Sequence, residues 1–190
     1  MSLLALDRRG VAAIEFAFVA PVLLGVYFMT MEVSQALEAN KKTGRIASMV
    51  GDLLTQQHKA SKDDIDAIMR IGGSIVQPYN RTQPSIYVTA IEITNEDTPK
   101  VKVVWSRKLV GDAASSYLAK DSITTVPPAL KIPGTFLIRA ESDLSYKPIL
   151  TWDAEAKQTV GLAAAFDSIA MKEQYYLRPR MSLAIPCTDC

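Results

Sequence analysis

The feature that most constrains this chain is a long apolar block near its start. Residues 11–31 read VAAIEFAFVAPVLLGVYFMTM, and Glu15 is the only charged residue among them. As a helix that rises about 1.5 Å per residue, the block is about 31 Å long, which matches a bilayer core of about 30 Å. We therefore predict a transmembrane helix over residues 11–31 and a single domain over residues 32–190.

Two other interpretations of the block stay open. In a cleavable secretory signal, Arg8 and Arg9 would form the basic start and the small residues of 34–36 would form the cleavage site. The apolar core of such a signal normally runs only about 7 to 15 residues, so this block is too long for one. The other alternative is the core helix of a soluble protein. Basic residues lie on both sides of the block, so charge counting does not set its orientation.

Composition limits the choice of partners. The chain has 190 residues, and its 21 Lys and Arg residues are balanced by 20 Asp and Glu residues. The basic residues are spread along the sequence instead of forming a run, so no footprint for nucleic acid is visible. We expect the membrane to be a partner, and we expect no nucleic acid.

A short ordered pattern surrounds the start of the apolar block. Arg8 and Arg9 are followed by Gly10, then by four small or apolar residues, then by Glu15 and Phe16. This pattern resembles the processing site of prepilins of the tight-adherence (Tad, or Flp) pilus machinery, and the chain resembles the TadE-like minor pilins, or pseudopilins, of that system. The resemblance implies that residues 1–10 are a prepilin leader and that a prepilin peptidase cuts between Gly10 and Val11. It also implies partnership with other pilins and pilus-assembly proteins.

The residue types at the cleavage site suit this chemistry. Gly10 has no Cβ, so it permits a close approach of a protease and an extended backbone just before the helix begins. Glu15 lies one helical turn, about 6 Å, from the α-amino group that Val11 would carry after cleavage. A carboxylate in lipid needs such a partner. The resemblance implies the amine of a neighbouring subunit, which would set the axial register; the alternative is that Glu15 only stabilises its own helix through the helix dipole.

The remaining sequence predicts an α+β fold. Helical spacing of apolar residues continues to about residue 56, and Ser61 is placed to cap a second helix whose first turn holds Asp63 and Asp64. Alternation then predicts a hairpin from strands over 86–94 and 101–106, a half-buried strand over 136–147 and a last strand over 181–185. A loop is expected over 126–134, and residues 154–171 fit either a helix or an excursion. A long N-terminal transmembrane helix that continues into a periplasmic domain with a small antiparallel sheet is the pilin-like plan.

Cys187 and Cys190 form a C-x-x-C pair. In an oxidising periplasm we expect a structural disulfide between them. Three alternatives remain: a redox active site, which would need a thioredoxin-like setting; a zinc site, for which His58 is the other soft donor of note; and free or intermolecular thiols.

Other candidates for chemistry are weak. His58 lies in a polar segment, and with one histidine no convincing nucleophile-and-base set can be assembled. Asp63, Asp64 and Asp66 lack the glycine and the distal glutamate of a calcium loop, so we interpret them as a solvated helix start. We predict no catalytic residue, metal, cofactor or small-molecule substrate.

The expected function is that of a non-enzymatic minor pilin, in the bacterial inner membrane with its domain in the periplasm, that takes part in assembly or initiation of a Tad pilus. The rival is a permanently anchored periplasmic scaffold or binding protein of a secretion system. A more distant rival is an exported enzyme.

Overall fold

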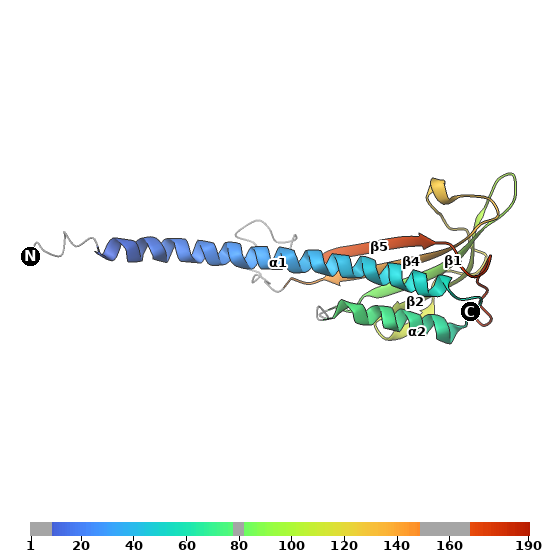
Figure 1. Cartoon of the computed structure of the whole chain (residues 1–190), viewed down its shortest axis with the longest axis horizontal. Helices are drawn as coiled ribbons and strands as arrows, with labels where there is room; N and C mark the ends of the chain where they lie inside the picture. Colours follow the sequence, from blue (N-terminus) through green and yellow to red (C-terminus); the bar gives the residue numbers. More distant parts are fainter. Residues whose placement is uncertain (1–8, 78–81, 149–167) are drawn as a thin grey trace, which may run out of the picture.

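A computed structural model describes residues 9–77, 82–148 and 168–190. A long helix, α1 (Arg9–Thr55), leads into a domain that begins with α2 (Lys62–Gly73) and the short 3-10 helix η1 (Ser74–Val76). The strands are β1 (Ser85–Ile93), β2 (Val101–Val110), β3 (Ala113–Ser116), β4 (Phe136–Tyr146) and β5 (Ile169–Leu177), with a second 3-10 helix, η2 (Pro128–Leu130), before β4. Figure 1 shows the first half of α1 projecting far beyond the domain. The predicted α+β class is confirmed.

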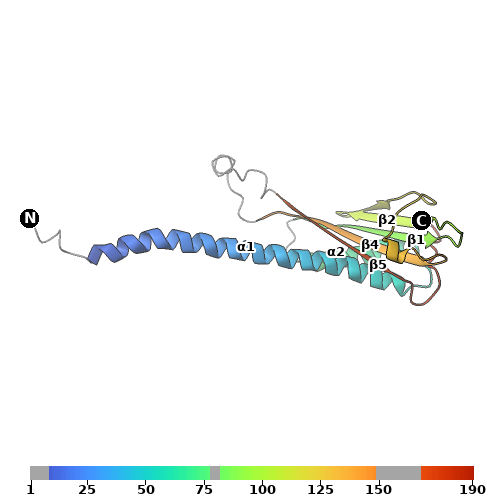
Figure 2. The same ribbon diagram turned by 90° about the horizontal axis from the view of Figure 1, so that it is seen from above.

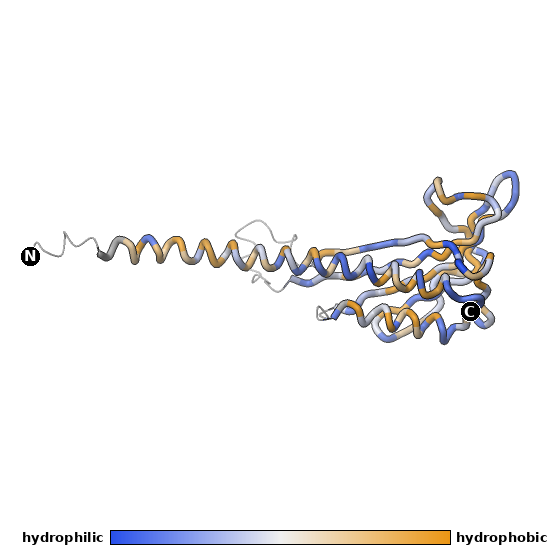
Figure 3. The backbone as a smooth tube through the Cα atoms, in the orientation of Figure 1, coloured by the Kyte–Doolittle hydropathy of each residue, from blue (hydrophilic) through white to orange (hydrophobic). Residues whose placement is uncertain are grey.

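Helix α1 is one continuous helix that changes surroundings along its length. It runs through Pro21 without a break and ends at Thr55, one residue from the predicted end. Its first half is predominantly apolar and stands alone, as the orange tube in Figure 3 shows. From Ala39 onward one face is fully buried, with Ile46, Val50 and Leu54 all at 0 % exposure. One helix therefore serves as both the projecting segment and a core element of the domain.

The sheet is antiparallel throughout, with strand order β3-β2-β1-β4-β5. The predicted hairpin is present as β1 and β2, and a register shift lies between Ala90 and Ile91. Helix α1 packs on β4 and β5, while α2 packs on β2 and β1. Figure 2 shows α1 lying along one face of this sheet. The core therefore lies between the second half of α1, helix α2 and one face of the sheet.

Two helix glycines permit this close packing. A Cβ on Gly51 would lie 2.5 Å from Leu177 Cδ1 of β5, and a Cβ on Gly72 would lie 2.5 Å from Val50 Cγ2 of α1. From helix propensity alone a mid-helix glycine weakens a helix by about 1 kcal/mol relative to alanine. Here Gly51 lets α1 approach β5, and Gly72 lets α2 approach α1.

The second face of the sheet is covered at one end. Leu137, on β4, packs there with Ile91, Ile93 and Val101, and Val126 and Leu130 of the predicted loop lie over them. Strand β4 is therefore buried on both faces near Phe136 and half-buried only toward Tyr146. The prediction of a half-buried strand is right for that second part alone.

The prediction of a last strand over 181–185 is wrong. The last strand is β5, and residues 178–190 follow it without regular structure. Met181 and Leu183 are 57 % and 96 % exposed, and only Ile185 of the predicted inward face is buried. Pro179 and Pro186 flank this stretch and donate no hydrogen bond to a ladder, and three alternating residues are too few to specify a strand. Of the undecided range 154–171, residues 154–167 lie outside the described residues, and Ile169–Met171 belong to β5.

Candidate functional site

The predicted cleavage site lies at the start of α1. The helix begins at Arg9, so the bond between Gly10 and Val11 falls within its first turn, and the expected extended backbone at Gly10 is not observed. Extending an existing helix by one residue adds a hydrogen bond at little cost, which accounts for the earlier start. Arg8, with the rest of residues 1–8, lies outside the described part of the chain.

The helix beyond this point has the surface of a membrane segment. An 18-residue window in the first part of α1 has a mean hydropathy of 2.0 and is 0 % buried, so the helix is long and apolar enough to cross a membrane. Phe16 and Phe18 are 71 % and 73 % exposed. Monomeric soluble proteins rarely expose a contiguous apolar surface of this kind. This segment therefore requires lipid or other helices around it.

Glu15 interrupts this surface. Its side chain is exposed on the helix, and within residues 9–77, 82–148 and 168–190 it has no hydrogen bond or ion pair. An ionisable group within an apolar span is a candidate functional residue because its charge is costly there without a partner. Any partner of Glu15 would therefore come from outside the described residues.

A second carboxylate marks the place where α1 meets the sheet. The Tyr146 hydroxyl of β4 donates a hydrogen bond to Glu32 Oε1 over 2.7 Å. Glu32 follows the predicted span directly, and Tyr146 is only 6 % exposed. The domain is thus attached to the helix at the point where the apolar segment ends. The sequence offered no signal for this pairing, which joins residues 114 positions apart.

A third carboxylate lies inside the domain. Asp66 of α2 accepts two hydrogen bonds of 2.7 Å from Arg107 Nε and Nη2 of β2, and both residues are buried. The hydrogen bond to Asp66 raises the pKa of Arg107 above its ordinary value. The interpretation of all three aspartates as a solvated helix start is therefore wrong for Asp66, because the sequence could not show that β2 brings an arginine to it. It holds for Asp63 and Asp64, which are exposed.

The predicted cap of α2 is present. The Ser61 hydroxyl accepts a hydrogen bond from the Asp64 backbone N–H, and the Asp64 carboxylate accepts one from the Ser61 N–H. Donation from the Ser61 hydroxyl and backbone N–H holds the pKa of Asp64 below its ordinary value. This reciprocal arrangement fixes where α2 begins.

Cys187 and Cys190 are joined as a disulfide, with their Cα atoms 5.6 Å apart. They belong to residues 178–190, which cross the end of the domain farthest from the projecting half of α1 (Figure 1). Asp189, between the two cysteines, accepts a 2.8 Å hydrogen bond from the Lys62 N–H at the start of α2. Whether the pair is oxidised in the cell stays a prediction.

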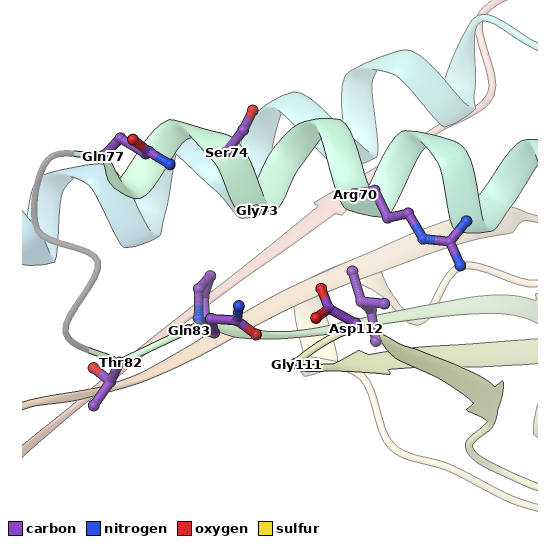
Figure 4. A pocket seen from close by; sticks show the side chains of 10 residues that line it. Arg70, Gly73, Ser74, Gln77, Thr82, Gln83, Gly111 and Asp112 are labelled. Carbon is purple, nitrogen blue, oxygen red and sulfur yellow. The ribbon is translucent and has the colours of Figure 1, made fainter.

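A pocket of about 340 Å³ lies between the end of α2, the start of β1 and the turn that joins β2 to β3. Arg70 and Asp112 supply its charged side chains from different elements, as Figure 4 shows. The Ser74 hydroxyl, also in the lining, donates to the Ile71 carbonyl of its own helix end. Neither histidine nor cysteine is among the lining residues, and His58 is exposed between α1 and α2.

Comparison with known proteins gives a family match for the segment that carries Glu15. The family model described as TadE-like protein matches residues 10–48, which include the predicted span and the helix as far as its first buried turns. The resemblance inferred from the sequence pattern is confirmed over those residues. Searches of curated proteins and of solved structures found no match. The chain is thus TadE-like over its N-terminal helix, which suggests a Tad pilus-associated protein anchored in a membrane.

Proposed function

We propose that this chain is a minor pilin, or pseudopilin, that takes part in assembly or initiation of a Tad pilus. In this proposal residues 11–31 cross the bacterial inner membrane, residues 32–190 lie in the periplasm, and a prepilin peptidase removes residues 1–10. The protein is not an enzyme. Its partners are the membrane, the peptidase, other pilins and pilus-assembly proteins.

The observation that carries the proposal is Glu15 on an exposed apolar helix. The segment matches the TadE-like family, and Glu15 has no partner within the described residues. Cleavage after Gly10 would place a cationic amine at Val11, one helical turn away. If the amine belongs to the same chain as Glu15, it compensates the charge of Glu15 and has no further effect. If the amine belongs to a neighbouring chain, it compensates the charge of Glu15 and also fixes the axial position of one subunit against the next. Ordered assembly needs such a fixed position.

The rigid connection of the helix to the domain supports the same proposal. Helix α1 continues unbroken from the apolar segment into the core, and the hydrogen bond from Tyr146 to Glu32 ties the sheet to it. A register set at Glu15 would therefore also position the domain. A scaffold held by a flexible tether would not need this continuity.

The test compares Glu15→Ala with wild type in the native host, scoring leader removal, membrane amount and surface fibres. We expect normal processing and insertion, because an apolar residue replaces a carboxylate in lipid, together with loss of fibres. Asp112→Ala is the matched control, since it removes an exposed carboxylate of the domain. If Glu15 only stabilised its own helix, the loss would be about 0.3 to 1 kcal/mol, too little to abolish assembly. Normal fibres from processed, inserted Glu15→Ala protein would contradict the proposal and favour the permanently anchored scaffold.

A further inference from the structure

The end of the domain farthest from the membrane segment is closed by residues 178–190. The Arg180 N–H donates to the Thr55 carbonyl at the end of α1, and the Trp105 indole N–H of β2 donates to the Ile185 carbonyl over 2.8 Å. Ile185 itself is fully buried in the main core. The segment is therefore part of the folded domain as far as Ile185.

The next residues are held by a short bridge to the turn between the helices. The Ala60 N–H donates to the Pro186 carbonyl over 3.0 Å, and the Thr188 N–H donates to the Ala60 carbonyl over 3.2 Å. These two bonds flank Cys187 and form the parallel bridge between Ala60 and Cys187. Cys187 is thus fixed through its neighbours' backbone.

Asp189 and Cys190 are held differently. Cys190 is joined to Cys187 by the disulfide and follows Asp189, whose carboxylate lies 3.6 Å from Cys187 Sγ. The disulfide closes a four-residue ring over Cys187–Cys190, and Asp189 lies inside that ring with its carboxylate on the Lys62 N–H. The ring therefore holds the carboxylate at the N-terminus of α2, where the helix dipole favours negative charge.

We propose that Cys187 and Cys190 form a thiol-oxidation site that controls the cap of α2 through Asp189. When the disulfide is closed, Asp189 satisfies the first amide of α2, next to the separate cap made by Ser61 and Asp64. When it is reduced, Asp189 and Cys190 leave the helix end, while the Ala60 bridge and the buried Ile185 stay in place. The oxidation state thus changes α2, the helix whose Asp66 is bonded to Arg107 of the sheet.

The oxidation requires a disulfide-bearing exchange protein as co-substrate. One thiolate of the pair attacks a sulfur of the partner's disulfide, and one partner thiolate leaves. The second cysteine, as its thiolate, then attacks the mixed disulfide and releases the other partner thiolate. Two electrons pass to the partner, which becomes a dithiol, and the two protons lost from Cys187 and Cys190 balance those that the partner's thiolates take up. Cys190 and its neighbours are exposed, as such an encounter needs.

The test measures amide hydrogen exchange of the full-length chain in detergent micelles, at Lys62, Ala60 and the sheet residue Val88. In the reduced protein and in the double variant Cys187→Ser with Cys190→Ser, we expect exchange at Lys62 to be about tenfold faster than in the oxidised protein. Exchange at Ala60 and Val88 should not change, because their hydrogen bonds do not depend on the ring.

Asp189→Asn is the matched variant, since it weakens the cap and keeps the disulfide. We expect it to accelerate exchange at Lys62 alone in the oxidised protein, and to add nothing in the reduced protein, where Asp189 has already left the helix end. Equal exchange at Lys62 in the oxidised and double-serine proteins would overturn the proposal, as would full protection at Lys62 in oxidised Asp189→Asn.

A second arm labels thiols in the native host before and after reduction, and both cysteines should react only after reduction. Labelling of both without reductant would contradict an oxidation site in the cell. This arm relies on the periplasmic location in the proposed function, but the exchange experiment does not. Failure of the exchange experiment therefore leaves the Glu15 proposal standing, and failure of the Glu15 test leaves the exchange result valid.

Discussion

The two halves of α1 belong to the same helix but face different surroundings. Residues 12–31 are almost entirely exposed, whereas the half that follows Ala39 buries one face against α2, β4 and β5. The carboxylates show the same contrast: Glu15 has no partner in the described residues, and Asp66 of the domain is bonded twice to Arg107. The stability of the domain should therefore depend on the second half alone, while insertion and assembly should depend on the first.

The largest expected effect is that of Asp66→Asn, which leaves Arg107 charged and buried without its partner. We expect a loss of about 3–5 kcal/mol in the free energy of unfolding of the domain. Urea unfolding in detergent micelles, followed by near-ultraviolet circular dichroism, measures it.

Two variants control for Asp66→Asn. Asp52→Asn breaks the ion pair with Arg180, in which the Arg180 side chain is 61 % exposed, so its cost should be at most about 1 kcal/mol. Glu15→Gln should leave the unfolding of the domain unchanged. A large loss from Glu15→Gln would remove the distinction between the two halves.

The same comparison can be made with one apolar substitution at two positions. Leu54 is fully buried and Leu23 is 61 % exposed. Leu54→Ala should lower the free energy of unfolding by about 2–5 kcal/mol because it leaves a cavity, whereas Leu23→Ala should change it by less than about 0.5 kcal/mol. Equal losses in the same urea experiment would mean that residues 12–31 pack against the domain.

The junction of the halves should give a smaller effect. Tyr146→Phe keeps the ring packed and removes the hydroxyl that donates to Glu32, so we expect a loss of about 1.5–3 kcal/mol, typical of a hydrogen bond to a charged group. Tyr176→Phe is the control, since within the described residues that hydroxyl accepts a hydrogen bond from the exposed Gln174 side chain and makes no other. If both variants unfold like wild type, the contact does not hold the sheet to the helix.

The smallest expected effect is the loss of stability at low pH that comes from Asp64. Because the pKa of Asp64 lies below its ordinary value, its contribution to stability is present above that value and is lost as the pH falls through the lowered pKa, below about pH 4. An NMR titration of the Asp64 carboxyl should show the lowered pKa in wild type and a return toward the ordinary value in Ser61→Ala. An unchanged titration in Ser61→Ala would show that Ser61 is not the cause.

The sequence predicted those parts of the fold that depend on local pattern. The helical spacing of apolar residues predicted α1 and, to within one residue, its end at Thr55. The capping residue Ser61 predicted the start of α2, and the alternation of apolar and polar residues predicted β1, β2 and β4. It did not predict β5, which begins inside the undecided range, or the pairings of Tyr146 with Glu32 and of Arg107 with Asp66. These contacts join distant segments, and nothing in the local spacing indicates them. Around the candidate site the roles of Gly10 and Glu15 stay predictions from the sequence pattern, whereas the position of Asp189 at the start of α2 could be found only from the fold.

The most direct test of the central assignment is the intact mass of the protein purified from both the membrane and the soluble fractions of its native host. If residues 11–31 are the anchor of a processed prepilin, the mass should correspond to loss of residues 1–10, with Val11 as the first residue. A chain that retains residues 1–10 would contradict processing. A chain that begins at Leu37 would show that the apolar block is a cleaved secretory signal and that no anchor remains.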